Sequence, residues 1–197
     1  MVIDEAFQIL LLSNVLKDCN FDNITKTIKS YQNKNQGVKV SNLGGWQSQA
    51  TTKLVDKNLK NVFNQINKGV DLLVKKLNIK NNLHLKNYWF NVNNFGSSNS
   101  VHHHLHVKSL NIISGVFYVN CPENSGQIVF LNPNKMISTI FDDSVVNKYD
   151  NFNSSQWNFN PQKGLFILFP SYLEHYVQPS FSNEDRISIA FNYGLNE

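Results

Sequence analysis

Four of the six histidines in this chain lie within one five-residue segment, as His102, His103, His104 and His106. In an extended strand alternate side chains share a face, so the three even-numbered imidazoles would point one way and His103 the other. Imidazoles two residues apart on one face can bind the same metal ion, as in the H-x-H and H-x-D pairs of β-sheet metal sites. The segment alone supplies no ligand from a second strand, so a solvated histidine-rich loop is the alternative.

A candidate ligand from a second strand is His175. It follows an apolar run, Leu165–Phe169, and a turn marked by Pro170, and it begins a segment that continues Tyr-Val-Gln-Pro. Taken alone, one histidine in such a place is more typical of a core or edge position than of a metal ligand. Together with the cluster at 102–106 it gives a candidate metal site drawn from two strands.

The chain contains 18 lysines and arginines, of which Arg186 is the single arginine. Period-two alternation places Arg186 and Ser188 on one strand face, with isoleucine and phenylalanine on the other. A planar guanidinium donates two parallel hydrogen bonds to a carboxylate and a neighbouring hydroxyl donates another, whereas lysine cannot reproduce that fork. These residues suggest a carboxylate-binding site, and a surface ion pair with Glu184 or Asp185 is the alternative.

The segments that carry these candidates predict a β-rich fold. Short runs rich in Ile, Val, Phe and Tyr are bounded by Gly, Pro, Asn and Ser, which is typical of a β-sandwich or barrel. These runs are residues 83–94, 112–119, 126–131, 164–169, 172–179 and 186–193.

The first part of the chain predicts helices instead. Apolar positions that repeat at three and four predict an amphipathic helix over 53–77, capped by Thr51 or Thr52. A second helix is expected to begin at an Asp22 cap and to run through Tyr31. We therefore expect a single domain over residues 1–197, mainly β, in which a helical part of residues 1–82 packs on a β-core of residues 83–197.

Composition argues against several classes of protein. Only 16% of the 197 residues are charged and the formal net charge is +4, so the surface is not densely basic and a nucleic-acid partner is not indicated. The apolar run Ile9–Leu12 is far too short to span a membrane. Cys19 and Cys121 have no metal-binding spacing and predict reduced thiols in a cytoplasmic setting. A homo-oligomer is compatible with all of these observations.

The order of the motifs resembles a known family. Residues 41–48 read SNLGGWQS, and Trp89 to His104 read W-x-N-x-N-x-x-G-x-x-N-x-x-H-x-H. A block F-P-S-x-L-x-H-x-V-x-P contains His175, and the closing motif R-x-S-I-x-F-N begins at Arg186. This series is similar to the Fe(II)- and 2-oxoglutarate-dependent oxygenases, and more narrowly to small members found in marine bacteria and their viruses. A viral origin would place the chain in the host cytoplasm.

The resemblance implies a double-stranded β-helix, a jelly-roll and cupin-like fold. It implies that His102 and His175 are iron ligands and that Arg186 with Ser188 binds the distal carboxylate of 2-oxoglutarate. The implied reaction uses O2 to convert 2-oxoglutarate to succinate and CO2 while a C–H bond of an acceptor is hydroxylated. The acceptor stays open between a peptide side chain, a small metabolite and a nucleobase.

One position departs from the family pattern. Where the usual two-histidine, one-carboxylate triad has Asp or Glu, two residues after His102, this chain has His104. Either three histidines bind the iron or His104 orients a water at a two-histidine site, and a shifted alignment would select His104 and His106 instead. Tyr118, Asn91 and Asn93 lie on the neighbouring predicted strands and are further candidates for contact with the cosubstrate.

Two functions of other classes compete with the oxygenase. A cupin-like metal enzyme could use the same barrel and three histidines without 2-oxoglutarate, although Arg186 and Ser188 would then have no role. A non-catalytic jelly-roll module is the other alternative, because a fold alone does not decide function.

Overall fold

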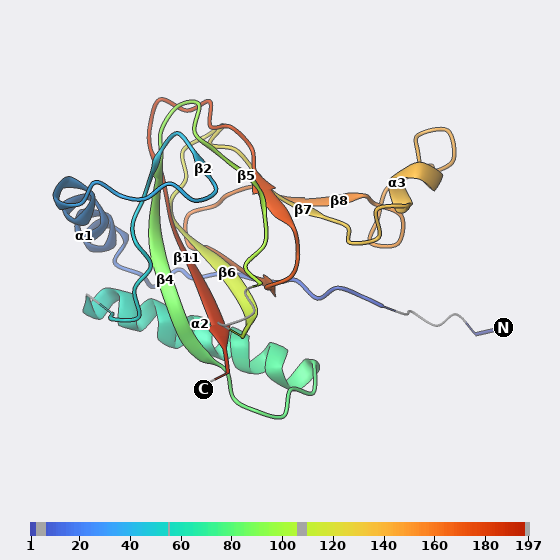
Figure 1. The fold of residues 1–197 in the computed structure, drawn as a ribbon, viewed down its shortest axis with the longest axis horizontal. Coiled ribbons are helices and arrows are strands. Elements are labelled where there is room, and N and C mark those ends of the chain that lie inside the picture. Colours follow the sequence, from blue (N-terminus) through green and yellow to red (C-terminus); the bar gives the residue numbers. More distant parts are fainter. Residues whose placement is uncertain (3–6, 55, 106–109, 196–197) are drawn as a thin grey trace.

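The computed structural model describes residues 1–197 except 3–6, 55, 106–109 and 196–197. Its described strands form two antiparallel sheets that face each other (Figure 1). The larger sheet has the order β1 (Leu12–Val15), β9 (Leu165–Pro170), β6 (Asn111–Asn120), β11 (Arg186–Gly194), β4 (His84–Asn93), β3 (Trp46–Gln47). The smaller sheet has the order β2 (Asn42–Leu43), β5 (Ser98–His102), β10 (His175–Val177), β7 (Ile128–Leu131), β8 (Gln156–Phe159). This arrangement agrees with the expected double-stranded β-helix.

The six apolar runs that predicted strands are confirmed as β4, β6, β7, β9, β10 and β11. Sequence patterns did not identify the short strands β1, β2, β3 and β8, and the strand expected to carry the histidine cluster, β5, ends at His102. Residues 1–82 contain both long helices and also the three strands β1, β2 and β3, which extend the two sheets at their edges. Strands of two to five residues carry too few alternations to give a period-two signal.

Two helices cover the outer face of the larger sheet. The long helix α2 (Lys57–Lys76) runs across β4 and β11, and α1 (Phe21–Lys34) lies beside it (Figure 1). Their apolar faces join one core with the outward side chains of β11, and the ring of Phe63 in α2 meets that of Phe191 edge-on at 5.5 Å between centroids. The outer face of the larger sheet therefore carries the main hydrophobic core, and a smaller apolar cluster lies between the two sheets, where β6 and β9 face β7.

Both helices begin at caps other than those predicted. The side chain of Asn20 accepts from the backbone N–H of Asn23, and that of Asp56 accepts from Asn58. Asp22 instead lies inside the first turn of α1, and the predicted Thr51 and Thr52 caps are wrong because α2 begins only at residue 57. An Asn or Asp oxygen directly before the first turn satisfies an otherwise unpaired N–H, which fixes these helix starts.

The glycine pair of the SNLGG segment lets the chain cross from one sheet to the other. β2 pairs with β5 in the smaller sheet, and β3 pairs with β4 in the larger one. Gly44 and Gly45 have φ angles of +69° and +65°, a left-handed conformation that glycine adopts without strain. This crossing links the edge of the smaller sheet to the edge of the larger one.

Truncating the core face of α2 tests this packing. Ile66 is fully buried under the larger sheet, whereas Leu72 on the same helix is 59% exposed. We expect Ile66→Ala to lower the free energy of unfolding by about 2–5 kcal/mol, because it leaves a cavity. Leu72→Ala should change it by less than about 0.5 kcal/mol. Urea denaturation of both variants measures the difference, and equal losses would contradict the assigned core face.

Candidate active site

The inner face of the larger sheet places polar side chains in rows across β4, β11 and β6. Alternation along β11 turns Ile187, Ile189 and Phe191 toward the helices, so Arg186 and every second residue after it point inward. The cross-strand pairs of this face are Asn93 with Arg186, Asn91 with Ser188, Trp89 with Ala190, and Asn87 with Asn192. On the other side of β11, Tyr118 lies beside Ser188 and Ser114 beside Asn192.

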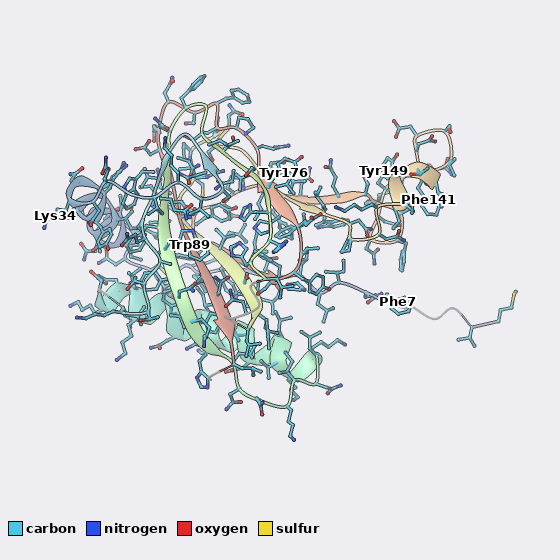
Figure 2. The ribbon with its side chains drawn as sticks, in the orientation of Figure 1. Phe7, Lys34, Trp89, Phe141, Tyr149 and Tyr176 are labelled. Carbon is cyan, nitrogen blue, oxygen red and sulfur yellow. The ribbon has the colours of Figure 1, made fainter. Side chains whose placement is uncertain are left out.

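A pocket lies between this face and the smaller sheet. Eight of the residues that the sequence analysis singled out for the site line it. These are His102, His104, His175, Arg186, Ser188, Tyr118, Asn91 and Asn93. Trp89 lies in the middle of the molecule, whereas Tyr149 and Phe141 lie on a projection between β7 and β8 that reaches away from the body (Figure 2). The pocket is thus separate from that projection.

Three imidazoles converge at one side of the pocket. His102 ends β5 and lies directly opposite His175, the first residue of β10. One ring nitrogen from each of His102, His104 and His175 lies within 4.8 Å of the others, and Nε2 of His104 is 3.2 Å from Nε2 of His175. His103 is exposed, while His106 lies outside the described residues, so the shifted pair of His104 and His106 is not tested.

Backbone carbonyls set the protonation of two of these rings. Nδ1 of His102 lies 2.7 Å from the carbonyl oxygen of Ser100, and Nδ1 of His175 lies 2.9 Å from that of Leu173. A carbonyl oxygen only accepts, so Nδ1 carries the proton in each ring and Nε2 keeps a free lone pair. Metal-binding histidines are typically oriented in this way by a hydrogen bond from the other ring nitrogen.

Burial keeps the three rings uncharged. It lowers the pKa of His175 to about 3, and burial together with the neighbouring imidazoles holds the pKa of His104 well below its usual value. The pKa of His102 is also lowered by burial. Neutral imidazole is the form that binds metal ions, so near neutral pH the cluster is ready to bind one without losing protons. Three neutral nitrogen donors suit Fe(II) among other divalent transition metals.

Arg186 lies at the other end of the pocket and is 2% exposed. Its Nη1 donates to the carbonyls of Ser125 and Gly126 at 2.7 and 3.1 Å, while its buried Nε has no partner among the described residues. Asp185 forms an ion pair with Lys29 instead, and neither ion pair of the described residues includes Arg186 or Glu184, so the alternative surface pair with Glu184 or Asp185 is not formed. Burial lowers the pKa of this guanidinium, because no described carboxylate offsets its charge.

A buried cation with an unpaired N–H is stabilised when an anion binds to it. Burying an uncompensated charge is strongly unfavourable, and a bound carboxylate would remove both the unpaired charge and the unpaired N–H. The neighbours of Arg186 are neutral hydrogen-bonding groups: Asn93 lies opposite it, and Ser188 follows on the same face. Burial raises the pKa of the Tyr118 phenol, which therefore keeps its proton and can act as a donor. This end of the pocket fits a carboxylate such as that of 2-oxoglutarate.

Three lining residues were quoted within the sequence motifs without being assigned a role. The Trp89 ring stacks on His104, with 5.4 Å between centroids and a 20° angle between planes. Asn99 donates to the hydroxyl of Ser41, which lies 3.5 Å from Nε2 of His102. Alternation from Asn93 back to Trp89 could have placed the indole on the pocket face. Ser41 could not have been placed, since its position depends on the crossing between the two sheets.

Comparison with known proteins agrees with this fold. A family model described as "Putative 2OG-Fe(II) oxygenase" matches residues 87–192. A Pseudomonas putida prolyl-4-hydroxylase is similar over 95% of this chain and 93% of its own, with 12% identity and a TM-score of 0.66. The epimerase SnoN from nogalamycin biosynthesis is similar over 93% of this chain and 78% of its own, with 12% identity and a TM-score of 0.67.

A third similar structure is that of the viral collagen prolyl hydroxylase vCPH from Paramecium Bursaria Chlorella virus-1, in its 2OG complex. It covers 96% of this chain and 98% of its own, with 11% identity and a TM-score of 0.62. No curated protein matches the chain in sequence. At these identities the likeness shows a shared fold, the double-stranded β-helix. Within the described part of the chain, neither long helix has the length and apolarity to cross a membrane.

The neutral imidazoles make the stability of the metal-free protein depend on pH. His175 binds no proton in the folded state until pH falls to about 3, whereas the unfolded chain binds one below about 6.5. The contribution of neutral His175 to the free energy of unfolding is therefore fully present above pH 6.5 and is lost as the pH is lowered. At pH 5 we expect His175 alone to reduce the free energy of unfolding by about 2 kcal/mol relative to pH 7.

Urea denaturation of the metal-free protein at the two pH values measures this loss. A His175→Gln variant should show a smaller difference between the two pH values than the wild type. Replacement of the exposed His103 by Gln is the matched control. Equal pH dependence in wild type and His175→Gln would show that this ring is not buried in its neutral form.

Proposed function

The chain belongs to the 2OG-Fe(II) oxygenase family, and on this premise we propose that its three pocket imidazoles bind the iron while Arg186 and Ser188 bind the distal carboxylate of 2-oxoglutarate. The enzyme is a dioxygenase that uses Fe(II), 2-oxoglutarate and O2. One observation carries the assignment of residues. The buried Arg186 guanidinium, which has no carboxylate partner among the described residues, lines the same pocket as the three metal-ligand candidates.

Bound Fe(II) and 2-oxoglutarate supply an oxidation by O2 in which 2-oxoglutarate loses CO2 to become succinate and an acceptor C–H bond is hydroxylated. The protein itself positions the iron and 2-oxoglutarate and shields them from water. His102 and His175 direct Nε2 lone pairs into the pocket from two paired strands. Arg186 offers a guanidinium fork at the opposite end, and Ser188 adds a hydroxyl.

The side walls of the pocket are neutral. Asn93 and the protonated Tyr118 phenol flank the guanidinium and can donate to a bound carboxylate. Val116, Ile128 and Phe169 form an apolar wall that limits water near the metal ligands. The acceptor, whether a peptide side chain, a metabolite or a nucleobase, would meet the neutral polar groups that remain. Both cysteines are free thiols, which supports the proposed cytoplasmic setting.

Succinate formation tests the proposal. Protein loaded with Fe(II) and supplied with 2-oxoglutarate and O2 should form succinate slowly even without its acceptor, in amounts equal to the 2-oxoglutarate consumed. A cupin-like metal enzyme that does not use 2-oxoglutarate, or a non-catalytic module, would form none. Protein without Fe(II) is the control, and succinate at the control rate would overturn the proposal.

Replacing the arginine by lysine isolates the guanidinium fork. Arg186→Lys keeps the charge but loses the bidentate geometry, so we expect about 1.5–3 kcal/mol weaker binding, a rise of roughly ten- to a hundredfold in the Kd for 2-oxoglutarate. Anaerobic calorimetry of the Fe(II)-loaded protein measures it. Lys29→Ala, which removes the nearby surface ion pair with Asp185, is the matched control and should leave the Kd unchanged. A Kd equal to that of the wild type in Arg186→Lys would reject the cosubstrate role.

Single histidine replacements test the metal ligands. We expect His102→Ala and His175→Ala to weaken Fe(II) binding severely, because each removes a direct donor, while His103→Ala leaves it close to that of the wild type. His104→Asp should still bind Fe(II), since a carboxylate is the commoner ligand at that place. Anaerobic Fe(II) titration of the folded variants gives these affinities, and His175→Ala binding as tightly as the wild type would remove that residue from the site.

A further inference from the structure

The turn of residues 121–127, between β6 and β7, holds the guanidinium of Arg186, and the proposed function gives that turn no role. Nη1 of Arg186 donates to the carbonyl oxygen of Ser125 at 2.7 Å and to that of Gly126 at 3.1 Å. Ser125 is 1% exposed and Arg186 is 2% exposed, so these hydrogen bonds are shielded from water. Because β6 belongs to the larger sheet and β7 to the smaller one, the turn meets Arg186 where the chain passes between the sheets.

The backbone of this turn is fixed by contacts that a side chain at residue 126 would break. Gly126 has a φ of +80°, a conformation that glycine adopts without strain. A Cβ atom there would lie 2.2 Å from the carbonyl oxygen of Gln178 and 3.0 Å from that of Pro179. The backbone N–H of Phe181 also donates to the carbonyl of Asn124 at 2.8 Å. The segment that joins β10 to β11 therefore packs directly against the turn and determines where its carbonyls lie.

The hydrogen bonds of the guanidinium determine which of its edges is left for a ligand. Nη1 carries two protons and has two carbonyl acceptors, so the turn occupies this nitrogen. Nε and Nη2 have no hydrogen-bond partner among the described residues. A guanidinium can donate two parallel hydrogen bonds to one carboxylate from its Nε–Nη2 edge or from its Nη1–Nη2 edge. Of these two edges, only the first has both donors free of described partners in Arg186.

We propose that the carbonyls of Ser125 and Gly126 position Arg186, so that Nε and Nη2 bind the cosubstrate carboxylate and the two terminal nitrogens do not bind it together. Gly126 is then a positioning residue, because a residue with a Cβ atom would displace the turn from the guanidinium. The inference rests on the proposed function, since it needs the distal carboxylate of 2-oxoglutarate at Arg186. It adds the edge of the guanidinium that binds and the residues that select this edge.

The turn orients the guanidinium before any ligand arrives. An arginine side chain has several rotatable bonds, and ordering them on binding would cost conformational entropy. With Nη1 held by two carbonyls, the Nε–Nη2 edge is already fixed, so less of that entropy is lost when a carboxylate binds. A lysine at residue 186 could donate to the same two carbonyls, but it would then have one donor left and no fork.

The single arginine of the chain makes the test direct. In the full chain labelled with 15N at arginine alone, every guanidinium NMR signal comes from Arg186. The protein is loaded with Zn(II), which is diamagnetic and leaves these signals sharp, and a through-space contact with the Nε proton identifies Nη2. Before 2-oxoglutarate is added, we expect separate signals for Nη1 and Nη2, because Nη1 is held by the turn. Addition of 2-oxoglutarate should move the Nε–H signal and one Nη2–H signal downfield, while the Nη1 signals change little.

Alanine at Gly126 tests the positioning role against a matched control. In Gly126→Ala the Nη1 and Nη2 signals should merge, and the Kd for 2-oxoglutarate should rise roughly tenfold, the size of effect of one hydrogen bond to a charged group. The Kd for Zn(II) should stay that of the wild type. Gly96→Ala has the same backbone strain, with a φ of +78°, but nothing lies within 4 Å of the added Cβ atom, so it should behave as the wild type. Ser125→Ala keeps the carbonyl and should leave the arginine spectrum unchanged.

Two outcomes overturn the inference while the proposed function stands. These are a wild type in which 2-oxoglutarate moves the Nη1 signals as strongly as the Nε–H signal, and a Gly126→Ala variant that binds 2-oxoglutarate as tightly as the wild type. An arginine spectrum that 2-oxoglutarate leaves unchanged would instead overturn the proposed cosubstrate role of Arg186, and the inference with it. The wild-type spectrum alone distinguishes these failures, so the test holds even if Gly126→Ala does not fold.

Discussion

The burial of Arg186, which has no carboxylate partner in the described part of the chain, is the constraint on which the rest of this structure depends. A guanidinium inside a protein is tolerated when its charge and its donors are matched, and here two backbone carbonyls match only part of them. The side chains that line the pocket beside it, Asn93, Ser188 and Tyr118, are neutral, so the protein itself does not complete the site. The unpaired charge of Arg186 therefore lowers the stability of the folded protein, and a bound anion would restore that stability. This is typical of a binding site and not of a structural ion pair.

The alternation of β11 connects this site to the core. Its apolar residues pack under α1 and α2, and this packing fixes the strand on which Arg186, Ser188 and Asn192 are presented inward. The smaller sheet brings His102 and His175 opposite each other through the pairing of β5 with β10. The end of the pocket that contains Arg186 thus belongs to β11 of the larger sheet, and the end with His102 and His175 belongs to β5 and β10 of the smaller sheet. The pairing of strands within each sheet fixes both ends.

Much of this arrangement could be predicted from the sequence because it depends on local alternation. The alternation of apolar and polar residues predicted the long strands and the shared face of Arg186 and Ser188. The H-x-H spacing predicted a pair of metal ligands. What could not be predicted depends on contacts between distant segments: the pairing of β1 with β9, the approach of Ser41 to His102, and the hydrogen bond between Ser114 and Ser171. A side chain's partner across a sheet depends on strand order, which no local pattern encodes.

The most direct test of the account is the visible absorption spectrum of the anaerobic protein. The account predicts that Fe(II) and 2-oxoglutarate added together give a charge-transfer band that neither gives alone, because the cosubstrate binds at Arg186 and at the metal in one pocket. A spectrum of the mixture equal to the sum of its separate components would contradict it, since the two ends of the pocket would then not hold one ligand between them.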